Sequence, residues 1–164
     1  MRLLAWTLGL AVGLAGAAPG APSGEFDLSA FACADAGGER LCRRSGDGTG
    51  SMEGATVRAI VLALRDGELA RVSWAFDENA FDRVRRQLAQ RLGPGEAGTE
   101  LLKAGMGGVF PNRFVVWRHD GQVWLLEQYF ERVIHSALTR MSPQEFDRLW
   151  SHRERLRVRG ARDL

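Results

Sequence analysis

The chain has 164 residues, of which 22 are basic and 20 acidic, giving a formal net charge of +2. This length fits one domain with a sizeable core. The near balance of charge excludes a long-range attraction to nucleic acid or to an anionic membrane surface.

Residues 1–17 have the pattern of a secretory signal peptide. Arg2 supplies a positive start, Leu3–Leu14 is an apolar run, and Ala15-Gly16-Ala17 is a small-x-small cleavage site. The apolar run is shorter than the roughly 20 residues that cross a membrane. We therefore predict cleavage after Ala17 and a periplasmic or secreted protein, with no membrane anchor because no cysteine lies near the cleavage site.

Residues 18–54 are predicted to form a flexible N-terminal segment that contains a disulfide loop. Cys33 and Cys42 are the only cysteines, and export would place them in an oxidising compartment. A structural bridge between them is the commonest arrangement for such a pair, and it would stabilise the protein by roughly 2–3 kcal/mol. The glycine- and serine-rich stretch Ser45–Gly54 lacks the Gly-Lys-Ser/Thr ending of a phosphate-binding loop and is interpreted as a connector.

An α+β domain is predicted over residues 55–158, beginning with a hairpin. The apolar stretches Thr56–Leu64 and Leu69–Phe76 flank Asp66-Gly67, which is a strong signal for a tight turn between two strands. In the second stretch Ala70, Val72, Trp74 and Phe76 alternate with polar residues, as on a half-buried strand.

A helix follows, with apolar residues at helical spacing (Phe81, Val84, Leu88 and Leu92) and an end at Gly93-Pro94. Asp77 or Asn79 is the expected cap of its first turn.

Gly95–Asn112 is rich in glycine and is predicted to be a long loop. Its later part, Ala104–Arg113, is the candidate binding segment. Phe110 offers an apolar contact, whereas Asn112 and Arg113 offer directional hydrogen bonds. The alternative interpretation is that Phe110 is buried in the core and the glycines only relieve a turn.

A second hairpin is predicted from Arg113–His119 and Gln122–Tyr129 around Asp120-Gly121. Residues 130–141 then fit either an amphipathic helix or a strand that returns after a turn. The last helix begins with the capping box Ser142-Pro143-Gln144-Glu145, and residues 159–164 are expected to form a C-terminal tail.

From Thr56 onward the layout resembles a group of small exported proteins of Gram-negative bacteria. The shared residues are the Asp66-Gly67-x-Leu69 hairpin, the Arg91–Pro94 helix end, the pattern of Gly108, Phe110, Asn112 and Trp117, the Leu126-Glu127-x-Tyr129 strand, and Ser136. In that group the chain turns after the tyrosine and returns as a strand. The resemblance therefore favours a strand over a helix for residues 130–141, and it implies no activity.

Few residues have the spacing of catalytic or metal-binding groups. His119, His135 and His152 lie far apart and form no ligand pair of the HxH or HExxH kind. Glu127 and Glu131 could share one face and serve as a carboxylate pair for hydrolysis. Such pairs on alternating positions are usually the solvated face of a sheet.

We thus expect an α+β fold with an antiparallel sheet of about five strands, in the order β-β-α-β-β-β-α, and with two helices packed on one face. The function that fits this composition best is a non-catalytic exported binding or envelope-accessory protein. Its partner would be an envelope protein or a small ligand, with no cofactor and no nucleic acid. A small periplasmic hydrolase that uses Glu127 and Glu131 is the alternative.

Overall fold

The computed structural model describes residues 26–46, 49–103, 109–131 and 134–162, without the side chains of residues 103 and 154–162. The predicted signal peptide, residues 104–108 of the candidate binding segment and the last two residues of the predicted tail lie outside the described residues.

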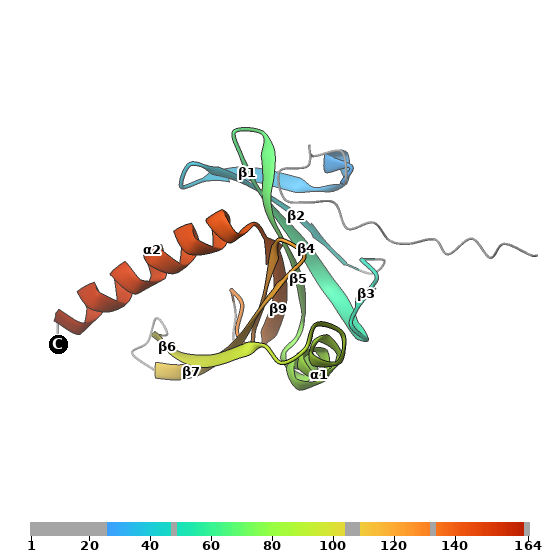
Figure 1. Ribbon diagram of the computed structural model, residues 1–164. Coiled ribbons are helices and arrows are strands. Elements are labelled where there is room, and N and C mark those ends of the chain that lie inside the picture. The colour runs from blue at the N-terminus through green and yellow to red at the C-terminus, as the bar shows by residue number, and fades with distance from the viewer. Residues whose placement is uncertain (1–25, 47–48, 104–108, 132–133, 163–164) are drawn as a thin grey trace, which may run out of the picture.

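The fold is α+β and is built on one antiparallel sheet (Figure 1). The strand order is β1-β2-β4-β5-β9-β8-β7-β6, and β3 pairs with β4. Within the described residues the strands are β1 (Ala32–Ala36), β2 (Glu39–Ser45), β3 (Ser51–Met52), β4 (Ala55–Arg65), β5 (Glu68–Asp77), β6 (Glu96–Lys103), β7 (Val109–His119), β8 (Gln122–Glu127) and β9 (His135–Met141). The helices are α1 (Phe81–Leu92) and α2 (Pro143–Arg162), with short 3-10 turns at Leu28–Ala30 and Glu78–Ala80.

The sheet has nine strands where the sequence predicted about five. Strands β1 and β2 lie in the predicted flexible N-terminal segment, β3 lies in the expected connector Ser45–Gly54, and β6 occupies much of the expected loop Gly95–Asn112. Both differences lengthen the sheet at its edges, because β1 and β6 are the two outermost strands.

Both predicted hairpins are confirmed. Asp66 and Gly67 have φ of 52° and 82°, and Asp120 and Gly121 have φ of 49° and 70°. Two consecutive residues in the left-handed region are what a type I′ turn requires, and this turn matches the twist of the strands it joins.

Helix α1 has the predicted length but not the predicted cap. It ends at Leu92 before Gly93, whose φ of 83° suits glycine. No side chain caps its first turn, and Ala80 stands at the N-cap position. Asp77 instead binds Arg58 across the β4–β5 hairpin, with 2.8 Å between Arg58 Nη2 and Asp77 Oδ2.

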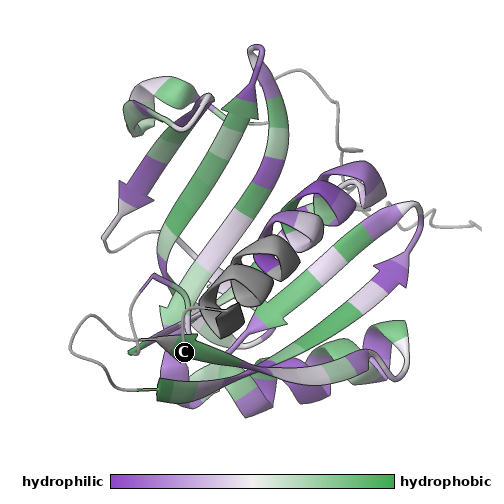
Figure 2. Ribbon diagram, turned by 90° about the vertical axis from the view of Figure 1, so that its left-hand side faces the viewer, coloured by the Kyte–Doolittle hydropathy of each residue, from purple (hydrophilic) through white to green (hydrophobic). Residues whose placement is uncertain are grey.

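The two helices lie on opposite faces of the sheet, so the prediction that both pack on one face is wrong (Figure 1). Helix α1 packs on a core that includes Val115 and Leu126, whereas Phe146 of α2 packs on a core that includes Val116 and Leu125. Consecutive strand residues point to opposite faces, so each of these adjacent pairs contributes to both cores. Figure 2, seen from the side of α2, shows this helix in front of the sheet.

The segment that the sequence left open is a strand. His135–Met141 forms β9 between β5 and β8, as the resemblance implied. Half of the predicted capping box is present, since Ser142 Oγ accepts a hydrogen bond from the Glu145 N–H at 3.1 Å. The Glu145 carboxylate turns instead to arginines of the sheet, and α2 continues past residue 158 to Arg162.

The predicted disulfide between Cys33 and Cys42 is present, with an S–S distance of 2.03 Å. The two residues face each other in the β1–β2 register, so the bridge lies within the sheet and not outside it as expected. A structural disulfide is typical of compartments other than the cytoplasm. Within the described residues, no helix is long and apolar enough to cross a membrane.

Candidate functional site

The β6–β7 hairpin carries all three predicted binding residues. Its register places Phe110 opposite Leu102, Asn112 opposite Glu100, and Arg113 opposite Thr99. Successive side chains alternate between the two faces, so these three residues do not form one surface.

Asn112 is buried, with 1% of its surface exposed. Its Nδ2 donates to Glu100 Oε1 at 3.2 Å, and its Oδ1 accepts from the Tyr129 N–H at 2.8 Å. These bonds connect β7 to β6 and to the turn after β8. The prediction that Asn112 is exposed for recognition is wrong, because its side chain is buried and its amide is hydrogen-bonded to Glu100 and Tyr129 of the same chain.

Arg113 joins the sheet to α1. Its Nε donates to Gln128 Oε1 at 2.8 Å, and its two Nη atoms each lie 3.3 Å from an oxygen of Asp82. The guanidinium also stands over the ring of Phe81, 4.7 Å from the centroid. Arg113 is exposed, but its guanidinium N–H groups already donate to Gln128 and Asp82 of the same chain.

Phe110 is 39% exposed, and two other exposed apolar side chains lie near the same end of the β6–β7 hairpin. Leu101 is 69% exposed and Val109 is 53% exposed, and the alternation of side chains places both on the face opposite to Phe110. We call Leu101, Val109 and Phe110 the hairpin end. The alternative hypothesis that Phe110 is buried in the core is therefore wrong.

The glycines of this region allow close packing between β6 and β7. A Cβ on Gly98 would lie 2.3 Å from Cζ of Phe114, and a Cβ on Gly95 would lie 2.6 Å from Val115 Cγ1. Glycine is required at both positions because large side chains of β7 cover the backbone. The residues that suggested a loop are thus explained by a strand.

A buried acidic pair lies under α2. Glu127 of β8 and Glu100 of β6 are 5% and 7% exposed, and both face Arg153 of α2. Arg153 Nη1 is 2.8 Å from Glu127 Oε1 and 3.6 Å from Glu100 Oε1. Burial raises the pKa of Glu127; the charge of Arg153 opposes this rise, and Glu100 adds to it. The arrangement fastens α2 to the sheet.

The predicted pair of Glu127 and Glu131 does not share a site. The Glu131 side chain is 44% exposed and binds Arg43 of β2, with 2.5 Å between Arg43 Nη1 and Glu131 Oε2. Glu127 is buried and faces Arg153. Sequence reasoning did not find the actual neighbour, Glu100, because Glu100 was assigned to a loop; the register of β6 with β7 reveals it.

A second charged cluster connects two hairpins to the start of α2. Glu39 and Glu145 contact the same three arginines, which are Arg65, Arg71 and Arg148. Burial alone would raise the pKa of Glu39, but hydrogen bonds from Arg71 and Arg65 outweigh it and lower that pKa to about 2. The pKa of Glu145 is lowered in the same way, by Arg148, Arg65 and Arg71.

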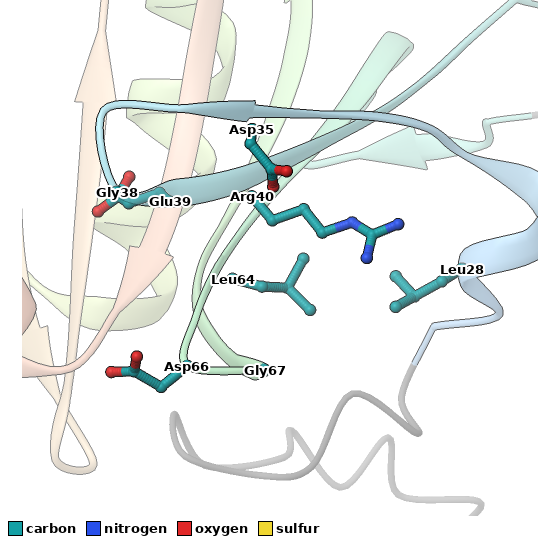
Figure 3. Close-up of a pocket in the computed structure, with 8 residues that line it drawn as sticks. All are labelled: Leu28, Asp35, Gly38, Glu39, Arg40, Leu64, Asp66 and Gly67. Carbon is teal, nitrogen blue, oxygen red and sulfur yellow. The ribbon is translucent and has the colours of Figure 1, made fainter.

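A hollow of about 460 Å³ separates the tips of the β1–β2 and β4–β5 hairpins (Figure 3). Arg40 extends across it, between Asp35 and Leu64. Asp35 and Arg40 are neighbours in the β1–β2 register, and Gly67 belongs to the β4–β5 turn. The hollow is thus a crevice between the ends of two hairpins, and its lining includes residues of both.

The three histidines lie in different elements, His119 in β7, His135 in β9 and His152 in α2. His119 Nε2 lies 3.1 Å from Asp120 Oδ2 at the β7–β8 turn. In the part of the chain that the structure describes, no three His, Cys, Asp or Glu side chains are grouped to hold a metal ion.

No family model, curated protein or solved structure matches this chain.

Proposed function

We propose that this chain is an exported, non-catalytic binding protein of the periplasm, and that it docks an envelope protein through the hairpin end. One observation carries the proposal. Of the four large hydrophobic side chains that are exposed among the described residues, three lie near this end of the β6–β7 hairpin, Phe110 on one face and Leu101 and Val109 on the other. Single exposed hydrophobics are common, whereas clustered ones are typical of interaction surfaces.

The framework beneath the hairpin end favours a fixed docking surface. Asn112 and Glu100 connect β7 to β6 just below it, and Arg113 connects β7 to α1. An apolar surface on a pre-ordered strand pair loses little conformational freedom when it binds, which favours affinity.

The disulfide and the amino-terminal sequence support export. A Cys33–Cys42 bridge fits an oxidising compartment, and residues 1–17 have the pattern of a signal peptide. The intact mass of the protein recovered from the periplasm should correspond to a chain that begins at Ala18. An uncleaved chain in the cytoplasm would contradict export.

A matched pair of variants tests the docking surface. Val109→Ser combined with Phe110→Ser removes two apolar side chains of the hairpin end, and Ile134→Ser is the control, because Ile134 is 59% exposed but lies elsewhere. In quantitative pull-downs from envelope extract, the hairpin variant should recover at least about tenfold less of the captured protein, which corresponds to about 1.4 kcal/mol. Unchanged capture by a variant with wild-type circular dichroism would contradict the proposal.

A further inference from the structure

Strand β6 is an open edge of the sheet (Figure 1). It has eight residues, pairs with β7 on one side, and has no strand on its other side among the described residues. Ala97, Thr99 and Leu101 along it are exposed. Soluble proteins usually shorten, charge or cover such an edge, because its free backbone groups can pair with another chain.

The hydrogen-bonding direction of β6 follows from its neighbours. The Gln128 N–H donates to the Arg113 carbonyl at 2.9 Å, so the main chain of Arg113 faces away from β6. Main-chain groups alternate in direction along a strand, so those of Asn112 face β6 and meet Glu100, its register partner. The N–H and C=O groups of Ala97, Thr99 and Leu101 therefore point outward from the sheet.

The side chains along this edge can pack against the same side chains of a second, antiparallel copy. Ala97, Thr99 and Leu101 form an uncharged row on one face, with a small residue at one end and a large apolar residue at the other. Glu96 and Glu100 lie on the opposite face, where Glu96 binds Arg118 and Glu100 lies near Arg153. An antiparallel copy of the same row would place Leu101 opposite Ala97.

We propose that β6 pairs with β6 of a second copy of this chain, antiparallel and with its two-fold axis at Thr99. The outward N–H and C=O groups of Thr99 then bond to those of Thr99 in the other copy, and each Leu101 covers an Ala97. The two sheets become one continuous sheet, in which Glu96 of each copy lies at an opposite end of the new strand pair. In this closed arrangement the two β6 edges are paired with each other, so no β6 edge remains free to bind a further copy.

The dimer overlaps the docking surface proposed above at Leu101, which belongs to the hairpin end and covers Ala97 of the other copy. Val109 and Phe110 belong to β7, one strand inward from the shared edge, so pairing leaves them uncovered. Because the two β6 strands run in opposite directions, the dimer would present Val109 and Phe110 of the two copies at opposite ends of the junction.

Sedimentation velocity of the purified protein over a concentration series tests the pairing. The wild type and Thr99→Ala should both sediment as dimers, because alanine keeps the backbone N–H. Thr99→Pro should be monomeric, with a dimer dissociation constant raised more than about tenfold, because proline removes an outward donor on an edge where it does not disturb the β6–β7 pairing.

A second variant keeps the test decisive if Thr99→Pro fails to fold. Thr99→Cys should form a covalent dimer under mild oxidation, because the two-fold axis places these residues within disulfide range of each other. Thr56→Cys, at an exposed position of β4, should not. A wild type that is monomeric at all concentrations, a folded Thr99→Pro that remains dimeric, or a β6 edge occupied only by a different protein would each overturn the proposal. Loss of dimerisation with unchanged capture by the hairpin end would leave the docking function standing.

Discussion

Asn112 is a polar side chain whose chemistry suggests recognition, but whose position gives it a structural role. It is almost fully buried, and both ends of its amide are bonded, to Glu100 and to the Tyr129 N–H. Removing a buried hydrogen-bonding group leaves its partners unsatisfied, which costs more than the net contribution of the bond itself.

Asn112→Ala should therefore lower the free energy of unfolding by about 1–3 kcal/mol. Chemical denaturation at neutral pH measures this, with Asn79→Ala as the control, because Asn79 is exposed. An Asn112→Ala variant as stable as the wild type would show that water replaces these bonds without cost.

Phe110 should behave in the opposite way. At 39% exposure, Phe110→Ala should change the free energy of unfolding by less than about 1 kcal/mol, whereas Phe76→Ala, at a fully buried position, should cost about 3–5 kcal/mol. The comparison is made by denaturation under identical conditions. A loss of several kcal/mol at Phe110 would place its ring in the core.

Among the elements, the β1–β2 hairpin depends most on a covalent constraint. It is the outermost strand pair at its edge, and Cys33 and Cys42 close a loop with a sequence separation of nine. On the chain-entropy account such a crosslink stabilises the folded state by limiting the unfolded one.

Replacing both cysteines with serine should lower the free energy of unfolding by about 2–3 kcal/mol and leave the other strands in place. Thermal denaturation and circular dichroism measure both effects, and alkylation of the wild type without reductant should find no free thiol. A free thiol in the wild type, or loss of the whole sheet in the variant, would contradict this view of the hairpin.

The cluster around Glu39 makes the junction of β2, the β4–β5 hairpin and α2 sensitive to acid. The pKa of Glu39 is about 2 in the folded protein, against an ordinary value of 4.5. A carboxyl group with a lowered pKa stabilises the fold above its unfolded pKa, and this contribution is lost as the pH falls from about 4.5 to 2.

Glu39→Gln should thus lower the free energy of unfolding at pH 7 by at most about 3 kcal/mol, and the difference from the wild type should vanish near pH 2. Glu131→Gln is the control, because its ion pair with Arg43 is exposed and should contribute little. A Glu39→Gln difference that persists unchanged at pH 2 would mean that packing and not charge explains it.

The elements predicted well are those with a local signal. Asp-Gly dipeptides between apolar stretches define both confirmed hairpins, and Gly93 defines the end of α1. Strand β6 was missed because its glycines read as loop residues, although Gly98 is required by the Phe114 ring that lies over it. That requirement comes from a residue 16 positions away and has no signature within β6.

For the whole molecule, the fold class could be predicted but the arrangement of layers could not. The apolar residues Val115 and Val116, and likewise Leu125 and Leu126, are adjacent in sequence and buried on opposite faces. Such continuous apolar stretches indicate a strand covered on both sides, which is the arrangement that α1 and α2 produce. Choosing which helix covers which face depends on contacts between distant segments.

The candidate site was predicted at the level of a segment and not of its residues. Phe110 belongs to the exposed hairpin end, as the binding hypothesis required. Asn112 and Arg113 instead connect β7 to β6 and to α1 through hydrogen bonds. Leu101 and Val109 were not among the candidates; the pairing of β6 with β7 places them near the same hairpin end as Phe110, on the opposite face.

The docking of an envelope protein through the hairpin end is tested most directly by photocrosslinking in living cells. A photoreactive phenylalanine analogue at position 110 should yield a discrete adduct between this protein and a different envelope protein. The same analogue at position 134, which is exposed but remote in the chain, should yield none. Absence of an adduct from position 110 in a folded, exported protein, or identical adducts from both positions, would contradict the account.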